Sequence, residues 1–148
     1  MAETVELREI TAETVRQVTA LAVAPDQEGY VAPNAVSIAE AYFQPKAWFR
    51  AIAAGEELVG FAMVYRDAEA GEFYVWRFMI DARHQGRGYG RRAVELLVEE
   101  ARGDGVERVT LSVVPGDRSA LEFYKRLGFG ETGNVHGKEI ELALPLSA

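Results

Sequence analysis

Three glycines spaced two residues apart are the first feature of this chain that points to chemistry. They lie in Gln85-Gly86-Arg87-Gly88-Tyr89-Gly90, the glycine turn, which follows an apolar segment and precedes one with helical periodicity. Such a turn bends sharply and directs backbone N–H groups at one spot. The unpaired N–H groups and the dipole of a helix N-terminus favour an anion, and Arg87, Arg91 and Arg92 add positive charge. The turn therefore predicts a pyrophosphate site.

Two other phosphate-binding glycine motifs do not fit. A P-loop needs Gly-Lys-Ser or Gly-Lys-Thr, and the sequence has neither. A dinucleotide fingerprint starting at Gly86 would put its third glycine at Arg91, and 148 residues are too few for two mononucleotide-binding halves. A purely structural turn is the alternative, but it needs one glycine rather than three beside arginines.

The composition limits the remaining chemistry. With no cysteine and two histidines, the chain excludes disulfides, thiolate zinc sites and a cysteine nucleophile, and we expect no metal. The formal net charge of -7 argues against a nucleic-acid partner. It favours cationic small substrates, although many proteins are acidic for solubility alone. Because the sequence has neither an apolar stretch of about 20 residues nor a basic leader, we expect a cytoplasmic protein without a membrane partner.

The elements that must position the glycine turn follow a mixed α/β order. Apolar alternation predicts strands at 5–10, 48–53, 57–66, 72–80, 109–113 and 139–144. Helical periodicity predicts helices from a Thr11 cap to before Pro25, from a Ser37–Glu40 capping box through Phe43, after the glycine turn to Gly103 or Gly105, and at 120–127. Residues 26–34 read as a loop. The order predicts one domain, residues 1–148, in which an antiparallel meander precedes a parallel, right-handed β-α-β crossover.

The glycine turn also matches a known pattern. Gln85, Gly88 and Gly90 fill Q/R-x-x-G-x-G/A, the acyl-CoA pyrophosphate motif of the GNAT acetyltransferase superfamily. Segments 76–86 and 119–129 resemble GNAT segments, and the similarity covers nearly the whole chain. Residues 77–90 are similar to bacterial spermine/spermidine (diamine) acetyltransferases. The resemblance implies the GNAT acyl-CoA N-acyltransferase fold, which has a central twisted, mostly antiparallel sheet with helices on both faces, and acetyl-CoA as the acyl donor.

In that fold the fourth strand splays from the fifth, and the pantetheine arm of the cofactor lies in the gap. The resemblance implies that backbone groups of Phe78 and Ile80 bind the arm and that a nearby N–H stabilises the oxyanion. Asp117 stands where relatives commonly carry an asparagine that contacts the cofactor, or it caps a helix that begins near Arg118. The expected cofactor-binding residues are Phe78, Met79, Ile80, Gln85, Gly86, Arg87, Gly88, Tyr89, Gly90, Arg91, Asp117, Ala120 and Tyr124.

Tyr124 is the expected catalytic side chain. The resemblance assigns the tyrosine at this position as the acid that protonates the leaving thiolate, and a thiol pKa of about 8.5 and a phenol pKa of about 10 suit that transfer. The alternative is an ordinary core tyrosine, because Tyr124 shares an apolar stripe with Ala120 and Leu127.

The acceptor site is less defined. Polyamine acetyltransferases often carry a carboxylate where this chain has Trp76, so the general base stays open among Glu72, Glu28, Glu40, His84 and a water chain. The resemblance places the acceptor pocket near Tyr30, Asn34, Tyr42, Phe43 and Trp76, with Tyr42 and Phe43 as core residues in the alternative. Aromatic rings beside carboxylates suit a cationic amine. The expected substrate-binding residues are Glu28, Tyr30, Glu40, Glu72 and Trp76.

We therefore expect an N-acetyltransferase that moves the acetyl group of acetyl-CoA to a polyamine-like primary amine by direct attack through a tetrahedral intermediate. Acetylation of a protein N-terminus or lysine is one alternative. A non-catalytic acyl-CoA-binding module is another, and its support is the missing carboxylate at Trp76. By analogy with the superfamily, a homodimer through residues 129–146 is a further expectation.

Overall fold

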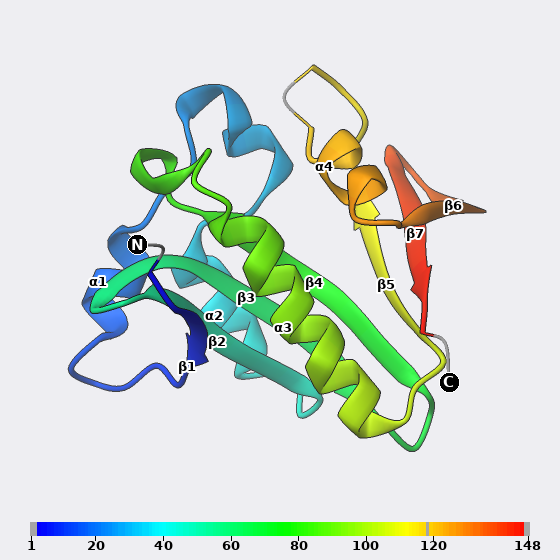
Figure 1. Cartoon of the computed structure of the whole chain (residues 1–148), viewed down its shortest axis with the longest axis horizontal. Helices are drawn as coiled ribbons and strands as arrows, with labels where there is room; N and C mark the ends of the chain where they lie inside the picture. The colour runs from blue at the N-terminus through cyan, green and yellow to red at the C-terminus, as the bar shows by residue number, and fades with distance from the viewer. Residues whose placement is uncertain (1–2, 118, 147–148) are drawn as a thin grey trace.

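A seven-stranded mixed sheet forms the centre of the computed structural model, which describes residues 3–117 and 119–146 (Figure 1). The strand order is β1-β2-β3-β4-β5-β7-β6. Only β4 and β5 are parallel among the neighbouring pairs of the described residues. The predicted mostly antiparallel sheet is confirmed. The strands are β1 (Val5–Arg8), β2 (Ala47–Ala54), β3 (Glu57–Asp67), β4 (Glu72–Ile80), β5 (Arg108–Val113), β6 (Gly130–His136) and β7 (Glu139–Pro145).

Helices cover both faces of the sheet. On one face lies α3 (Tyr89–Asp104), which links β4 to β5 (Figure 1). Its apolar stripe is buried and consists of Ala93, Val94, Leu97, Val98 and Ala101. The short α4 (Leu121–Arg126) packs into the same core through Tyr124. A second core lies under α1 (Val15–Ala20) and α2 (Asn34–Ala41). Two 3₁₀ turns, η1 (Pro25–Tyr30) and η2 (Ala82–His84), connect these elements.

Strand β6 was not predicted, because its segment has the wrong pattern. It carries Gly130, Gly133 and mostly polar residues, and nearly all of it is exposed at the edge of the sheet. Its pairing with β7 shifts between Glu131 and Val135, so apolar residues do not alternate. The predicted loop at 26–34 was also incomplete, since it overlaps η1 and its last residue, Asn34, begins α2.

The predicted capping box at Ser37 is wrong. Pro33 precedes the first residue of α2, and Ser37 is buried inside the helix with its hydroxyl donating to Pro33 O at 3.4 Å. Proline suits a helix start because its nitrogen has no hydrogen to leave unpaired. Glu40 lies near the other end of α2 and pairs with Arg77.

The predicted cap at Asp117 is also wrong. Helix α4 begins at Leu121, whose N–H donates to the hydroxyl of Ser119 at 3.2 Å, and Asp117 is exposed in the preceding loop. Arg118, where that helix was expected to begin, lies outside the described residues. The N-cap position is Ala120, and the serine beside it, closer to the helix start than Asp117, accepts from the first helical N–H.

The sheet opens between β4 and β5. The two strands pair only through Tyr74 with Thr110 and Val75 with Leu111. The next residue of β4, Trp76, is a bulge, because Met63 of β3 pairs with Arg77 while Val64 pairs with Val75. Beyond the bulge, β4 continues along β3, and the splay implied by the family resemblance is present.

Across residues 3–117 and 119–146, no helix combines the length and apolarity needed to cross a membrane.

Candidate active site

The glycine turn has a backbone shape that other residues would resist. Gly86 and Gly88 have φ values of 80° and 84°, in the region that favours glycine. Gly88 is the N-cap of α3, and the first helical bond runs from Arg92 N to Gly88 O. The N–H groups of the three residues between them are therefore free of helical bonds, at the positive end of a 16-residue helix. This arrangement fits an anion.

A cavity of about 540 Å³, the turn cavity, runs from the glycine turn along the end of β4. It contains most of the expected cofactor-binding residues. Arg87 is exposed on the turn and Asp117 is exposed in the β5–α4 loop, and neither lines this cavity. The lining residues are Val23, Gln27, Tyr30, Val31, Phe78, Met79, Ile80, His84, Gln85, Gly86, Gly88, Tyr89, Gly90, Arg91, Ser119, Ala120, Phe123 and Tyr124.

A second cavity of about 510 Å³, the strand cavity, occupies the splay between β4 and β5. It is lined by Tyr74–Phe78 of β4, Leu111–Val114 at the end of β5, residues 28–33, Ser119, Ala120, Tyr124 and Glu139. The two cavities share Tyr30, Val31, Phe78, Ser119, Ala120 and Tyr124. A molecule in one cavity can therefore approach a molecule in the other beside these residues.

Tyr124 lies at this junction inside an aromatic cluster. Its ring centroid is 5.1 Å from that of Phe123, 5.5 Å from Phe129 and 6.4 Å from Phe78. Burial raises the pKa of the Tyr124 phenol well above its ordinary range, so the hydroxyl stays protonated and can donate a hydrogen bond. No group among the described residues hydrogen-bonds to this hydroxyl. Tyr124 is buried, as its core alternative required, and it also lines both cavities.

The charges of the strand cavity favour a cation. Glu28 and Glu139 line it, and neither carboxylate forms an ion pair within the described part of the chain. Its one lining cation among the described residues, Arg77, donates to Glu40 at 3.0 Å and lies 5.5 Å from the ring centroid of Trp76. Glu40 thus neutralises Arg77, while Glu28 and Glu139 line the same cavity as the rings of Tyr30, Tyr74 and Trp76.

The other acceptor-site candidates lie elsewhere. Glu72 stands at the start of β4, opposite Asp67, and lines neither cavity. Asn34 is buried and donates to Val18 O at 2.9 Å. Tyr42 and Phe43 are 85% and 81% exposed, so neither the pocket nor the core interpretation holds for them. Tyr30 and Trp76 do line the strand cavity.

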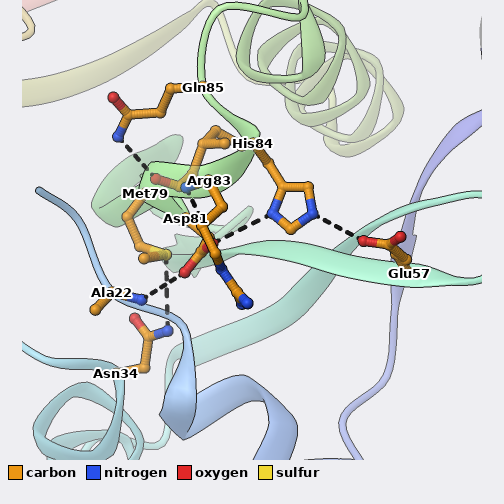
Figure 2. Close-up of polar contacts among 9 residues, drawn as sticks. Ala22, Asn34, Glu57, Met79, Asp81, Arg83, His84 and Gln85 are labelled. Carbon is orange, nitrogen blue, oxygen red and sulfur yellow. Dashed lines mark hydrogen bonds and ion pairs between the residues drawn. The ribbon is translucent and has the colours of Figure 1, made fainter.

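A polar network supports the turn cavity (Figure 2). The buried carboxylate of Asp81 accepts hydrogen bonds from Ala22 N and from Arg83, and faces His84 Nδ1 at 3.3 Å; His84 Nε2 lies 2.8 Å from Glu57. Burial alone would raise the pKa of Asp81, but the bonds from Ala22 and Arg83 outweigh it and hold that pKa below its ordinary range. His84 is therefore engaged on both ring nitrogens.

Gln85 links the turn to the rest of the site. Its side-chain amide donates to Ile80 O at 2.9 Å (Figure 2). The same amide donates to the Gln27 side chain at 3.0 Å. The side chain of this motif residue thus binds protein groups, while the residue also lines the turn cavity.

Some lining residues were not anticipated. Phe123 was not among the expected site residues, although it directly precedes Tyr124 and lines the turn cavity. A side-chain carbon at Gly90 would lie 3.3 Å from its ring, so the third glycine makes room for Phe123. Glu139 carried no sequence signal, because β7 lies beside β5 only through the order of strands in the sheet. Arg77 lies on β4 between Trp76 and Phe78, and its pairing with Glu40, 37 residues away in the sequence, appears only in the fold.

Comparisons with known proteins agree with this geometry. The sequence model of the acetyltransferase (GNAT) family matches residues 15–129. The chain is 26% identical to the spermine/spermidine N(1)-acetyltransferase of Bacillus subtilis (strain 168), over 88% of this chain and 91% of that protein. It is 36% identical to the mycothiol acetyltransferase of Gordonia bronchialis, over 72% of this chain but 35% of that longer protein.

A solved structure shows the same fold. The PaiA N-acetyltransferase of Thermoplasma acidophilum, in complex with coenzyme A, superposes with a TM-score of 0.74 at 14% identity, over 97% of this chain and 99% of that chain. The family match spans the glycine turn, both cavities' shared residues and Tyr124. This chain belongs to the acetyltransferase (GNAT) family and is an acetyl-CoA-dependent acetyltransferase.

Proposed function

We propose that this protein transfers the acetyl group of acetyl-CoA to a primary amine of a small, polyamine-like molecule. The observation that carries the proposal is the position of Tyr124. It lines both a cavity on the glycine turn and a cavity with two carboxylates, Glu28 and Glu139, that form no ion pair with any other described residue. The similarity to the Bacillus subtilis spermine/spermidine enzyme supports the same acceptor class.

The turn cavity suits acetyl-CoA. The free N–H groups at the start of α3, with Arg91 beside them, would hold the pyrophosphate. The pantetheine arm would lie along Phe78–Ile80, where β4 has no β5 partner. Its acetyl thioester would then reach the junction beside Tyr124.

The reaction follows from this placement. The neutral amine nitrogen attacks the thioester carbonyl carbon, forming a C–N bond and a tetrahedral oxyanion. The C–S bond then breaks, the Tyr124 hydroxyl supplies the proton that the departing sulfur takes up, and solvent reprotonates the tyrosine. The attacking nitrogen loses one proton to solvent as the tetrahedral intermediate collapses to the amide, and an earlier proton leaves the substrate ammonium to generate the neutral amine. Among the four side chains considered as base, Glu28 is the one that lines the strand cavity, and we propose it, directly or through water, as the acceptor of that proton.

Thiol release provides the test, because the chain has no cysteine of its own to react. Acetyl-CoA is incubated with spermidine, spermine, aminoglycosides, amino acids and short peptides, and free CoA is measured with a thiol reagent. We expect turnover with polyamines. Tyr124→Phe should lower kcat by roughly a hundredfold. Tyr65→Phe, outside both cavities, is the matched control and should leave kcat unchanged.

Each alternative has its own outcome. Turnover with peptides but not polyamines would replace the proposal with protein acetylation. Binding of acetyl-CoA without turnover on any amine would point to a binding module, and an unaffected Tyr124→Phe enzyme would remove the acid assignment. The cytoplasmic location and the homodimer stay predictions.

A further inference from the structure

Asp81 is a buried charge that the proposed reaction does not use. Of the buried polar residues in the described part of the chain, it alone is ionisable, and its side chain is 5% exposed. A buried carboxylate is costly unless several donors satisfy it. Asp81 follows the last residue of β4 and precedes η2, so it sits between the strand end and the glycine turn.

Its two oxygens serve different segments. Oδ1 accepts from Ala22 N at 2.9 Å, which holds the chain leaving α1. Oδ2 accepts from Arg83 N at 3.2 Å and Arg83 Nε at 3.0 Å, and faces His84 Nδ1 at 3.3 Å (Figure 2). All three Oδ2 partners belong to η2. The far nitrogen of His84 then faces Glu57 at the start of β3, 2.8 Å away.

The η2 residues that Asp81 Oδ2 contacts lie, in the sequence, between the two groups of residues that line the ends of the turn cavity. Ile80, at the strand end, comes immediately before Asp81, and Gln85 and the glycines come immediately after His84. An extended ligand contacts the strand with one part and the turn with another. It therefore binds well only when the strand end and the turn are held in a fixed position relative to each other.

We propose that Asp81 is a positioning residue for acetyl-CoA, which fixes the glycine turn relative to the end of β4 through η2 and, by way of His84, to Glu57. The inference rests on the assignment of the turn cavity to acetyl-CoA. It does not depend on which amine is acetylated.

Asp81→Asn separates the two oxygens. An asparagine oxygen can still accept from Ala22 N, whereas its amide nitrogen cannot accept from Arg83 or His84. We expect the Kd for coenzyme A, measured by calorimetry, and the KM for acetyl-CoA to rise roughly tenfold, as loss of hydrogen bonds between charged groups would give. The kcat at saturating acetyl-CoA and the KM for the amine should stay within about twofold.

Asp104→Asn is the matched control. Asp104 is 14% exposed and accepts two bonds of 2.7 Å from Arg66 at the other end of α3, outside both cavities. It should lower the melting temperature without changing the Kd for coenzyme A. Equal changes in Kd for both variants, or a change in kcat and both KM values together for Asp81→Asn, would show that Asp81 only stabilises the fold.

Glu57→Ala covers the case in which Asp81→Asn does not fold. Glu57 is 72% exposed at its side chain and lies outside the cavities, so its removal leaves the core intact. We expect the Kd for coenzyme A to rise by about threefold with kcat unchanged. An unchanged Kd would count against the proposal. Calorimetry measures coenzyme A binding without turnover. Inactivity toward every amine would therefore overturn the proposed acceptor, while the Kd values for coenzyme A would still test the role of Asp81.

Discussion

At the scale of single residues, this site separates the group that protonates the leaving sulfur from the groups that attract the amine. Tyr124 is enclosed by aromatic rings, which keep its hydroxyl protonated. Glu28 and Glu139, by contrast, are exposed residues that line the strand cavity. A buried donor and exposed anions are therefore held within one site without neutralising each other.

Glu139 offers a prediction at this scale. Glu139→Gln keeps the size of the side chain and removes its charge, so a polyamine should bind less well. We expect the KM for the polyamine to rise roughly threefold, as for loss of a partly exposed ion pair. The kcat and the KM for acetyl-CoA should be unchanged. Steady-state kinetics with spermidine measure this effect, and Glu72→Gln, outside both cavities, is the matched control. An unchanged KM in Glu139→Gln would exclude this carboxylate from acceptor recognition.

Glu40 makes a second prediction through its neighbour. Glu40→Gln leaves the charge of Arg77 without its anion beside the strand cavity. A polyamine, which carries additional positive charges, should then be repelled, and its KM should rise by about threefold. The KM of a monoamine without a second charge should rise less. Measuring the KM of a polyamine and of a monoamine at the same pH tests this. Equal effects on both amines would mean that Glu40 only supports the shape of the cavity.

At the scale of elements, the start of α3 shows why three glycines recur at such short spacing. Gly86 and Gly88 are needed for backbone angles, whereas Gly90 is needed for space, because its neighbour is the ring of Phe123. The turn and α4 are therefore packed against one another around the cavity that the ligand would fill.

Gly90→Val tests this packing. A branched side chain would displace Phe123 into the turn cavity, so we expect the Kd for coenzyme A to rise more than tenfold with a smaller loss of stability. Gly103→Ala is the control within the same helix. Nothing lies within 4 Å of an added carbon there, and it should stabilise the protein by roughly 0.5–1 kcal/mol. Calorimetry and thermal melts measure the two effects, and normal cofactor binding in Gly90→Val would contradict the packing argument.

The sequence allowed most elements to be predicted, and the failures have physical causes. The bounds predicted for β4 match the structure, because an apolar strand between turns has a clear pattern. The capping box at Ser37 failed because local spacing matched while Pro33 already started the helix. The turn cavity was largely foreseen, since its residues are contiguous on the glycine turn and β4. The place of Glu139 at the strand cavity was not foreseen, because only the folded sheet brings β7 beside β5. The pairing of Arg77 with Glu40 was not foreseen either, because the two residues lie 37 positions apart in the sequence.

At the scale of the whole molecule, two carboxylates tie folding to pH. The pKa of Asp81 lies below its ordinary value for the reasons given above. The pKa of Glu141 is lowered by a hydrogen bond from Thr132, against a smaller opposing effect of burial, and by a further bond from Asn134. In both cases the folded state favours the ionised form, so each group stabilises the fold above its ordinary pKa and loses this contribution as the pH falls.

Acid titration is the corresponding prediction. The melting temperature should be nearly constant from neutral pH down to about pH 5. It should fall as the pH passes below the ordinary values of 4.5 for Glu141 and 3.8 for Asp81. Glu141→Gln should melt lower at neutral pH and show a weaker dependence in the acid range. If the melting temperature of Glu141→Gln fell with pH as steeply as that of the parent protein, other carboxylates would account for the loss of stability in acid.

The brief pairing of β4 with β5 gives the sheet a seam. Two residue pairs join the part made of β1 to β4 with the part made of β5, β7 and β6, apart from the packing of α3 and α4. A ligand whose amides hydrogen-bond to strands on both sides of this seam would hold the two parts of the sheet together. Amide hydrogen exchange in both should therefore slow together when coenzyme A binds, so the substrate becomes a structural member of the fold during each turnover.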